Sequence, residues 1–483
     1  MPDQPGIAAA PTSTTAFVGR TRRGPTDRAV AVGSYAEFER VYGGSWEGSA
    51  LPASVRDFFT NGGRNAVVAR LYRPDGAGSS RATLALGTLE LEAADEGEWG
   101  NELVARIDHE VDEHLFTVSV RDGAGGTVET FDDLSVSPAH PRFVAAVLEA
   151  QSRLVRVSAL GAERPDATPD LAAASGSDGQ PLDDDDFVGS GLQAAERGLY
   201  LLEQADDVNL LVIPPYSADG GVGTEVVAAA AEYCEERRAV LLVDPPPGWR
   251  SVADVVAAAE QGFERTLGTA GPNAAMFFPR VRRIDALPGE GLVAPSGAVA
   301  GVIARTDVVR GVWTAPAGKE ATLDGVRSLA VELPDGDVAR LASVGVNALR
   351  TLPSAGPVVW GARTLQGADR SASEWRYLPV RRLALFIEES LDRGTRWAVF
   401  EPNDEALWSR IREDADRFLA GLLLQGALRG GTPREAYVVR CDSTTTTQAD
   451  VDRGVVNIVV GFAPLRPAEF VIVRLQQLAG QPC

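Results

Sequence analysis

Short apolar runs alternate with amphipathic segments of helical length in the middle of the chain. The runs at 208–213, 239–244 and 274–281 are mostly aliphatic or aromatic, and the segments at 225–238 and 252–262 repeat apolar residues every three or four positions. Buried strands that alternate with amphipathic helices are typical of a mostly parallel sheet covered on both faces. The pattern therefore predicts an α/β domain.

A different pattern occupies residues 81–160. Apolar and polar residues alternate at 102–110, 114–122 and 127–136, which is the period of half-buried strands. The sequence DGAGG at 122–126 predicts a hairpin turn between two of these strands. We therefore expect a β-rich domain inserted into the α/β domain. The stretch that follows, up to residue 190, is rich in Gly, Ser, Asp and Pro and predicts a loop or linker.

The last third of the chain predicts an α+β domain that begins near residue 341. Pro379 and Gly394 are the expected ends of one helix, and Asn403 is the expected cap of a second helix with an apolar stripe. Strands are expected before, between and after these helices, at 347–353, 358–365, 396–401, 435–441, 455–462 and 470–476.

Together the patterns predict a multidomain protein of the α/β and α+β classes, as expected for 483 residues. The predicted parts are an N-terminal segment that packs with the C-terminal domain (1–24), a middle, mostly parallel α/β domain (25–80 and 190–340), an inserted β-rich domain (81–189) and a C-terminal α+β domain (341–483).

Composition and charge narrow the function classes. The chain is 45% hydrophobic and 23% charged, which is ordinary for a globular protein, and its formal net charge is −21. Such a charge argues against direct nucleic-acid binding, which uses Lys and Arg to neutralise phosphates. The sequence contains no run of about 18 apolar residues, the length that a membrane-spanning helix needs. The first residues also lack a basic segment and an apolar core, so we expect no secretory signal and a cytoplasmic location.

Candidate catalytic groups are sparse. Ser217 and Asp244 lie at predicted strand ends, where α/β enzymes place catalytic residues, but no histidine follows either of them. The three histidines, His109, His114 and His140, all lie in the inserted segment. A Ser–His–Asp triad in the usual α/β-hydrolase chain order is therefore excluded. Carboxylates are too abundant for any pair to indicate glycosidase chemistry.

Cofactor and metal motifs are equally weak. The sequence GGVGTE at 220–225 lacks the GxGxxG spacing and predicts a tight turn. His109, Asp112 and His114 could be named as metal ligands, but positions 109 and 114 point to opposite faces of a strand. The run DDDD at 183–186 predicts a solvated turn and helix cap. We therefore predict no catalytic residue, cofactor or metal. Cys234 and Cys441 are expected to be buried, reduced thiols.

Several motifs point to one family. Residues 396–476 contain FEPN, LW, QGAL with GG, and APL with PAEFV in that order, and this region resembles the C-terminal region of the tail sheath proteins of contractile injection machines. The family includes the sheaths of contractile phage tails, R-type pyocins and extracellular or cytoplasmic phage-tail-like particles. APSGAVAGVIARTDVVRGVWTAPAG at 294–318 and AFVGRTRRGP near the start are similar to further blocks of the family, and EWGNELVARI resembles the inserted domain of its longer members.

The resemblance implies a structural subunit, not an enzyme. Sheath subunits stack as six-fold rings around an inner tube, with baseplate and terminal cap proteins as further partners, and the sheath contracts to drive the tube outward. The resemblance also implies that the C-terminal domain faces the tube and that the inserted domain lies outside. The assembly would form in the cytoplasm, with or without later release of the whole particle. A baseplate or cap protein with a sheath-like core, and an α/β enzyme with an added β domain, are the alternatives.

Two sets of residues are the predicted interaction sites. The final strand is apolar on both faces, so it is either covered in its own domain or donated to a neighbour's sheet, as sheath subunits donate extended arms; its residues are Phe470, Val471, Ile472, Val473, Arg474 and Leu475. On the helix 404–425, Arg410, Arg412 and Arg417 are the candidates for contact with the tube.

The N-terminal arm departs from the family pattern. Only eleven residues precede Thr12, where sheath proteins usually have a longer strand-forming arm. The expectation is a subunit that is linked differently or that occupies a special ring, or a misplaced start codon.

Overall fold

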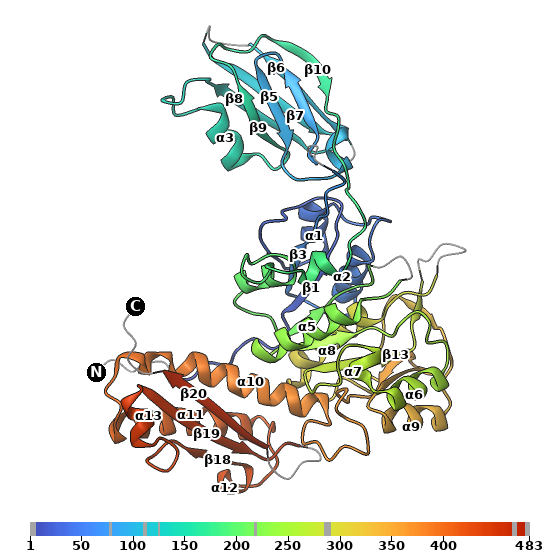
Figure 1. The fold of residues 1–483 in the computed structure, drawn as a ribbon, viewed down its shortest axis with the longest axis vertical. Helices are drawn as coiled ribbons and strands as arrows, with labels where there is room; N and C mark the ends of the chain where they lie inside the picture. Colours follow the sequence, from blue (N-terminus) through green and yellow to red (C-terminus); the bar gives the residue numbers. More distant parts are fainter. Residues whose placement is uncertain are drawn as a thin grey trace.

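The computed structural model describes residues 6–76, 80–109, 114–123, 126–216, 220–284, 291–465 and the backbone of 471–478. Figure 1 shows three parts: a β-rich part at the top, an α/β part in the middle and a C-terminal part at the lower left. The first described residues, near Ile7, and the last described strand, which ends at Leu478, both lie in or beside the C-terminal part. This arrangement of separate sheets and helices confirms the predicted multidomain α/β and α+β fold class.

An eight-stranded sheet forms the centre of the middle part, in the order β17-β16-β13-β12-β11-β1-β3-β2. All pairings from β16 to β3 are parallel, and only the two edge strands are antiparallel. The strands are β1 (Thr15–Gly19), β2 (Val30–Val32), β3 (Ala66–Arg70), β11 (Leu210–Val212), β12 (Val240–Val243), β13 (Ala274–Phe278), β16 (Asn347–Leu352) and β17 (Gly356–Trp360).

Both faces of this sheet are covered, because its central strands β11, β12 and β13 are apolar at every position. In β12, Leu241 and Val243 belong to the core on one face, whereas Val240 and Leu242 belong to the core on the other. The helices on the first face are α4 (Asp184–Val188), η2 (Gly198–Gln204), α5 (Thr224–Glu236), α6 (Val252–Gln261), α7 (Phe263–Thr266) and α9 (Asp335–Ser343). Those on the second face are α1 (Tyr35–Tyr42), α2 (Leu51–Thr60) and α8 (Ser296–Arg310).

The two helices α2 and α8 touch at glycine. A Cβ on Gly301 would lie 2.4 Å from the carbonyl oxygen of Phe58, and one on Gly297 would lie 2.4 Å from that of Ser54. The small residues Gly297 and Gly301 of α8 therefore let the two helix backbones approach closely. A small antiparallel pair is formed by β14 (Val281–Arg283), which precedes α8 in the sequence, and β15 (Val326–Leu329), which follows α8.

The inserted domain contains two antiparallel sheets that enclose one core, with orders β10-β6-β7-β8 and β4-β5-β9. Its elements are β4 (Thr83–Leu86), β5 (Leu89–Ala93), η1 (Glu98–Glu102), β6 (Leu103–Asp108), β7 (Phe116–Asp122), β8 (Val128–Leu134), α3 (Val144–Gln151), β9 (Val155–Leu160) and β10 (Thr168–Ala172). The prediction that the whole stretch 161–190 is a loop or linker is wrong, because this stretch contains β10, in which Thr168 and Leu171 pair with β6.

The C-terminal part packs two long helices against a three-stranded sheet of order β18-β19-β20. Its elements are α10 (Leu378–Thr395), η3 (Arg396–Phe400), α11 (Glu405–Leu424), α12 (Pro433–Ala436), β18 (Tyr437–Arg440), α13 (Gln448–Asp452), β19 (Val455–Phe462) and β20 (Val471–Leu478). The strand expected at 396–401 is wrong, because the chain continues from α10 into the 3-10 turn η3. Asp404 rather than Asn403 caps α11, and its Oδ1 accepts from the backbone N–H of Ala406 at 2.9 Å.

Three predicted boundaries change with the topology. β1 was placed in the segment that packs on the C-terminal domain, yet it lies inside the large sheet between β11 and β3. β16 and β17 were placed in the C-terminal domain, yet β16 pairs with β13, because Ala348 and Leu349 bury on opposite faces of the large sheet. Phe187 of α4 packs in the core of the middle part and not in the inserted domain. With these elements moved, the four-part division stays our proposal.

Candidate assembly site

The C-terminal sheet is the natural place for contacts between copies, because it has two strand edges. β20 pairs with β19 over its whole length, from Phe462 opposite Val471 to Val455 opposite Leu478. β18 is half as long and pairs only with the C-terminal half of β19, from Val459 to Phe462. The described residues add no strand beyond β18 or β20. Unpaired strand edges accept further strands through main-chain hydrogen bonds.

The predicted donated strand falls on β20. Phe470 lies outside the described residues, and Val471 to Leu475 lie in β20, where the strand pairs within its own chain. α10 and η3 lie next to β20 (Figure 1). A single chain offers no neighbour's sheet, so donation stays a prediction.

The three candidate arginines of α11 do not share one face. Arg410 and Arg417 are seven residues apart and are both exposed, whereas Arg412 lies on the opposite side of the helix. Arg412 donates to the backbone oxygen of Cys441 and to Glu405 Oε1 at 2.7 Å, so its guanidinium serves the domain itself. Arg410 stacks on Trp397, with 4.3 Å from its guanidinium carbon to the ring centroid, and Arg417 pairs with Asp414 at 2.9 Å. Arg410 and Arg417 remain the candidates for contact with a partner.

A buried ion pair joins the C-terminal part to the middle part. Arg382 of α10 binds both oxygens of Asp307 of α8, at 2.8 and 2.6 Å, and both side chains are at least 96% buried. The same guanidinium donates to the backbone oxygen of Thr12 at 2.7 Å. One side chain therefore holds α8, α10 and the N-terminal segment together. Sequence reasoning missed it, because both residues fall within helical patterns that hold several other charged residues.

The described start of the chain runs along α10. The backbone N–H of Ala10 donates to Ser390 Oγ at 3.0 Å. Ile7 packs over Gly394, where a Cβ would come within 2.6 Å of the Ile7 side chain. The N-terminal segment thus reaches the C-terminal part before the chain enters β1.

The part of the molecule that most resembles an enzyme site is a cavity of about 290 Å³ at the carboxyl ends of β11 and β12, beside the start of α5. Asp244 lies in it and accepts from Ser296 Oγ at 2.6 Å and from the Ser296 backbone N–H at 3.0 Å. Burial raises the pKa of Asp244 to about 6. Its hydrogen bonds tie the end of β12 to the first turn of α8, which is a structural use of the carboxylate. Ser217 lies outside the described residues.

The other polar candidates also have structural partners. His109 Nε2 lies 2.8 Å from the backbone oxygen of Pro165, and His140 Nδ1 accepts from the backbone N–H of Arg142 at 3.1 Å, both within the inserted domain. The side chain of Asp186 closes a capping box with Asp183 at the start of α4, as predicted for the DDDD run. Within the described residues, no group of three or more His, Cys, Asp or Glu side chains is placed to hold a metal ion.

Two further sequence predictions concern cysteine and membrane. Cys234 and Cys441 are buried free thiols, and burial raises the pKa of both, that of Cys441 to about 12, so both stay protonated at neutral pH. Cys483 lies outside the described residues. Among the helices that the structure describes, none combines the length and the apolar character needed to cross a bilayer.

Comparison with known proteins identifies the architecture. A sequence model of the "phage tail sheath protein central domain" matches residues 193–365, and one of the "phage tail sheath C-terminal domain" matches residues 370–477. Together they cover more than half of the chain. Among curated relatives, the tail sheath protein of Vibrio phage KVP40 is 27% identical over 180 residues, which are 37% of this chain and 26% of that protein. The match thus spans about a quarter of the relative's length.

Solved structures match over almost the whole chain. A sheath tail protein from Listeria innocua aligns with a TM-score of 0.69 at 14% identity, covering 97% of this chain and 96% of the other. The sheath complex of the extracellular contractile injection system PVC, in its contracted state, aligns with a TM-score of 0.58 at 21% identity, covering 99% and 96%. At such identities these likenesses show the fold.

The fold and the two matched domains define a structural protein of phage-tail type. More specifically, the chain belongs to the phage tail sheath protein family, which confirms the resemblance carried by the sequence motifs.

Replacing the buried carboxyl Asp244 by Asn changes how stability depends on pH. The folded protein holds the Asp244 proton up to about pH 6, and the unfolded chain holds it only up to about 3.8. The stability from this proton is present at low pH and is lost as pH rises through 6, by about 3 kcal/mol at most. Asp244→Asn has no such loss. Thermal unfolding at pH 5 and 7.5 should show that the stability of Asp244→Asn relative to the wild type increases as pH rises. A stability difference that is the same at both pH values would contradict this prediction.

Breaking the Arg382–Asp307 pair leaves a buried charge without its partner. Arg382→Met and Asp307→Asn should each lower the free energy of unfolding by about 3–5 kcal/mol, and the double variant Arg382→Met/Asp307→Leu should recover part of the loss. The control is Arg310→Met, whose partner Glu320 is 83% exposed, with an expected change below about 1 kcal/mol. Denaturant unfolding of the purified subunit measures all four; equal effects of Arg382→Met and Arg310→Met would refute the role of the buried pair.

Proposed function

We propose that this protein is the structural subunit of a contractile sheath in a phage-tail-like injection machine. Copies polymerise as stacked six-fold rings around an inner tube, and shortening of the stack drives the tube outward. The observation that carries the proposal is the presence of both sheath domains within a fold that aligns nearly end to end with sheath subunits. The free energy for contraction is stored in the lattice, so the subunit needs no cofactor and no catalytic step.

The C-terminal sheet supports self-assembly through strand addition. Burying the large apolar side chains of the final strand contributes at most about 10 kcal/mol, and ordering its backbone costs roughly 6–12 kcal/mol. The strand is therefore close to break-even by itself, and small gains from neighbouring copies decide where it pairs. In the isolated chain it pairs with β19. In the sheath we propose that the same strand completes the sheet of an adjacent copy.

The remaining partners follow from the proposed orientation. The C-terminal part faces the tube at small radius, and the inserted domain lies on the outside. Arg410 and Arg417 present their guanidinium groups from α11 to the tube protein. The ends of the sheath contact a baseplate and a terminal cap. Assembly takes place in the cytoplasm. Any release is of the whole finished particle.

Removing the final strand tests whether it is donated. The variant that ends at residue 469 should form no sheaths when it is co-expressed with the tube protein, whereas its purified subunit should unfold within about 1 kcal/mol of the wild type. A donated strand contributes to the lattice and not to the subunit, as the break-even estimate implies. A control that ends at residue 478 keeps β20. Negative-stain microscopy measures sheath formation.

The opposite outcome has a distinct signature. A strand that belongs to its own domain would cost the subunit several kcal/mol when it is removed, or would prevent folding. Hydrogen exchange on the intact, isolated subunit gives the same answer independently, because strong protection of 471–475 would place the strand permanently in its own sheet.

Reversing the charge of α11 tests the contact with the tube. Arg410→Glu/Arg417→Glu should weaken cosedimentation of sheath with tube about tenfold or more, since rim charges set complementarity between partners. The matched control is Arg340→Glu on α9, because Arg340 also pairs with an Asp three residues earlier and is similarly exposed. Sheath lengths should not change in either variant. Equal cosedimentation of the two variants would contradict the assignment.

A further inference from the structure

The inserted domain meets the rest of the molecule at a narrow neck. Figure 1 shows it projecting from the end of the middle part that carries α1, β1 and β3. Two chain segments cross this neck side by side. Tyr72 Oη donates to the backbone oxygen of Ser177 at 3.1 Å, and the backbone N–H of Gln180 donates to the backbone oxygen of Arg73 at 2.9 Å. Two such segments alone would leave the inserted domain free to swing.

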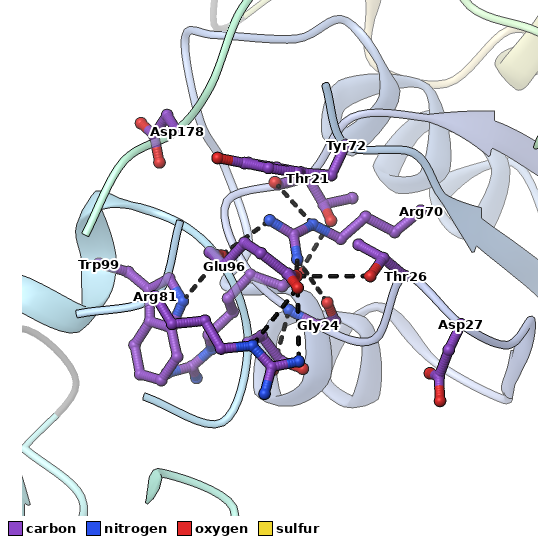
Figure 2. A network of polar contacts seen from close by, with 12 residues as sticks. Thr21, Gly24, Thr26, Asp27, Arg70, Tyr72, Arg81, Glu96, Trp99 and Asp178 are labelled. Atoms are coloured by element: carbon purple, nitrogen blue, oxygen red, sulfur yellow. Dashed lines mark hydrogen bonds and ion pairs between the residues drawn. The ribbon is translucent and has the colours of Figure 1, made fainter. Parts of the chain in front are cut away.

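A buried guanidinium lies at this neck. Arg70 is the last residue of β3 and is 2% exposed. Its Nε and Nη1 donate to the backbone oxygens of Thr21 and Gly24, at 3.3 and 2.5 Å, in the loop that follows β1. Its Nη2 donates to the backbone oxygen of Glu96 at 2.8 Å, and Nη1 lies 3.3 Å from Glu96 Oε2. One side chain therefore binds the middle part and the inserted domain at once (Figure 2).

Glu96 is held from both sides. Its carboxylate accepts from Thr26 Oγ1 at 3.4 Å, on the middle part, and from Arg81 Nε and Nη2, both at 3.4 Å, at the start of the inserted domain. The backbone oxygen of Glu96 also accepts from Trp99 Nε1 at 3.2 Å. Figure 2 shows the carboxylate between the two guanidinium groups. The buried charge of Arg70, joined to a mostly buried carboxylate with several partners, costs far more to separate than an exposed ion pair.

Two more arginines of the same loop contact the inserted domain at other points. Arg23 Nη1 lies 3.0 Å from Asp122 Oδ2 at the end of β7, in a pair whose side chains are 18% and 5% exposed. Arg20 Nη2 donates to the backbone oxygen of Asp178 at 2.7 Å. The loop itself is fixed at Gly24, where φ is +107° and a Cβ would lie 2.6 Å from the ring of Tyr42.

We propose that Arg70 is a clamp that locks the inserted domain to the middle part, so that this domain is a rigid arm and not a tethered, independently moving module. Contacts at Glu96, Asp122 and Asp178 fix both the tilt and the rotation of the arm. The inserted domain has its own hydrophobic core. The clamp therefore acts on the orientation of the inserted domain and leaves its internal structure intact.

The test separates orientation from folding by hydrogen exchange on the purified subunit. In Arg70→Met, backbone amides at the junction, in 20–27 and 94–102, should exchange about tenfold faster or more, while β6 and β7 keep their wild-type protection. Small-angle scattering of the same sample should show a broader distribution of distances. Glu96→Gln removes only the carboxylate partner and should change the junction in the same direction, by less.

The control is Arg28→Met, a change on the same loop at an exposed arginine that pairs with Asp27. It should leave both readouts unchanged. Unchanged exchange at the junction in Arg70→Met would overturn the clamp, and so would loss of protection in β6 and β7, because Arg70 would then be part of the domain's own fold. Should Arg70→Met yield no folded protein, Glu96→Gln decides by the same two readouts. None of these measurements requires a sheath, so they are independent of the proposed assembly.

Discussion

The relative placement of the three parts depends on buried guanidinium groups at their junctions. Arg382 joins the C-terminal part to the middle part through Asp307, and Arg70 joins the inserted domain to the middle part through Glu96. Both arginines also bind backbone oxygens of the N-terminal region, Arg382 at Thr12 and Arg70 at Thr21 and Gly24. A planar fork with five donors suits this task, because it can satisfy several acceptors from different segments while remaining charged. Lys319 is the only lysine in the sequence, and the arginine-biased composition thus has a structural use inside the subunit.

The element pattern of the middle part could be predicted from the sequence, because its signals are local. A continuous apolar strand such as β12 predicts its own burial on both faces of a sheet, and the structure confirms it. The segment at 396–400 was predicted as a strand and forms a 3-10 turn, because a short, mostly apolar segment is equally compatible with a strand and with the 3-10 turn that follows α10. β16 and β17 were assigned to the wrong part, because sheet order is a long-range property that the strand pattern does not contain.

The functional features also divide into those that have a local sequence signal and those that depend on contacts between distant residues. Motif order identified the sheath family, since it depends on short local sequences at fixed places in the chain. Arg70 and Arg382 gave no such signal: the carboxylates that pair with them lie 26 and 75 residues away, and many other arginines have acidic residues nearby in the sequence. Among the predicted tube-facing arginines, helical periodicity alone would have separated Arg412 from Arg410 and Arg417. The contact of Arg412 with the backbone of Cys441 required the tertiary structure.

In the proposed account the parts of the subunit are locked together, and the described residues place no further strand on either edge of the C-terminal sheet. Such a subunit is suited to work in a lattice, where movement occurs between copies. The most direct test of this account is a cryo-electron microscopy map of the particle assembled with its tube protein. We predict six copies per ring, with the C-terminal part at small radius against the tube, the inserted domain at large radius, and the final strand of each copy in a neighbour's sheet. A map in which the inserted domain faces the tube, or a chain that forms no rings beside its tube protein, would contradict it.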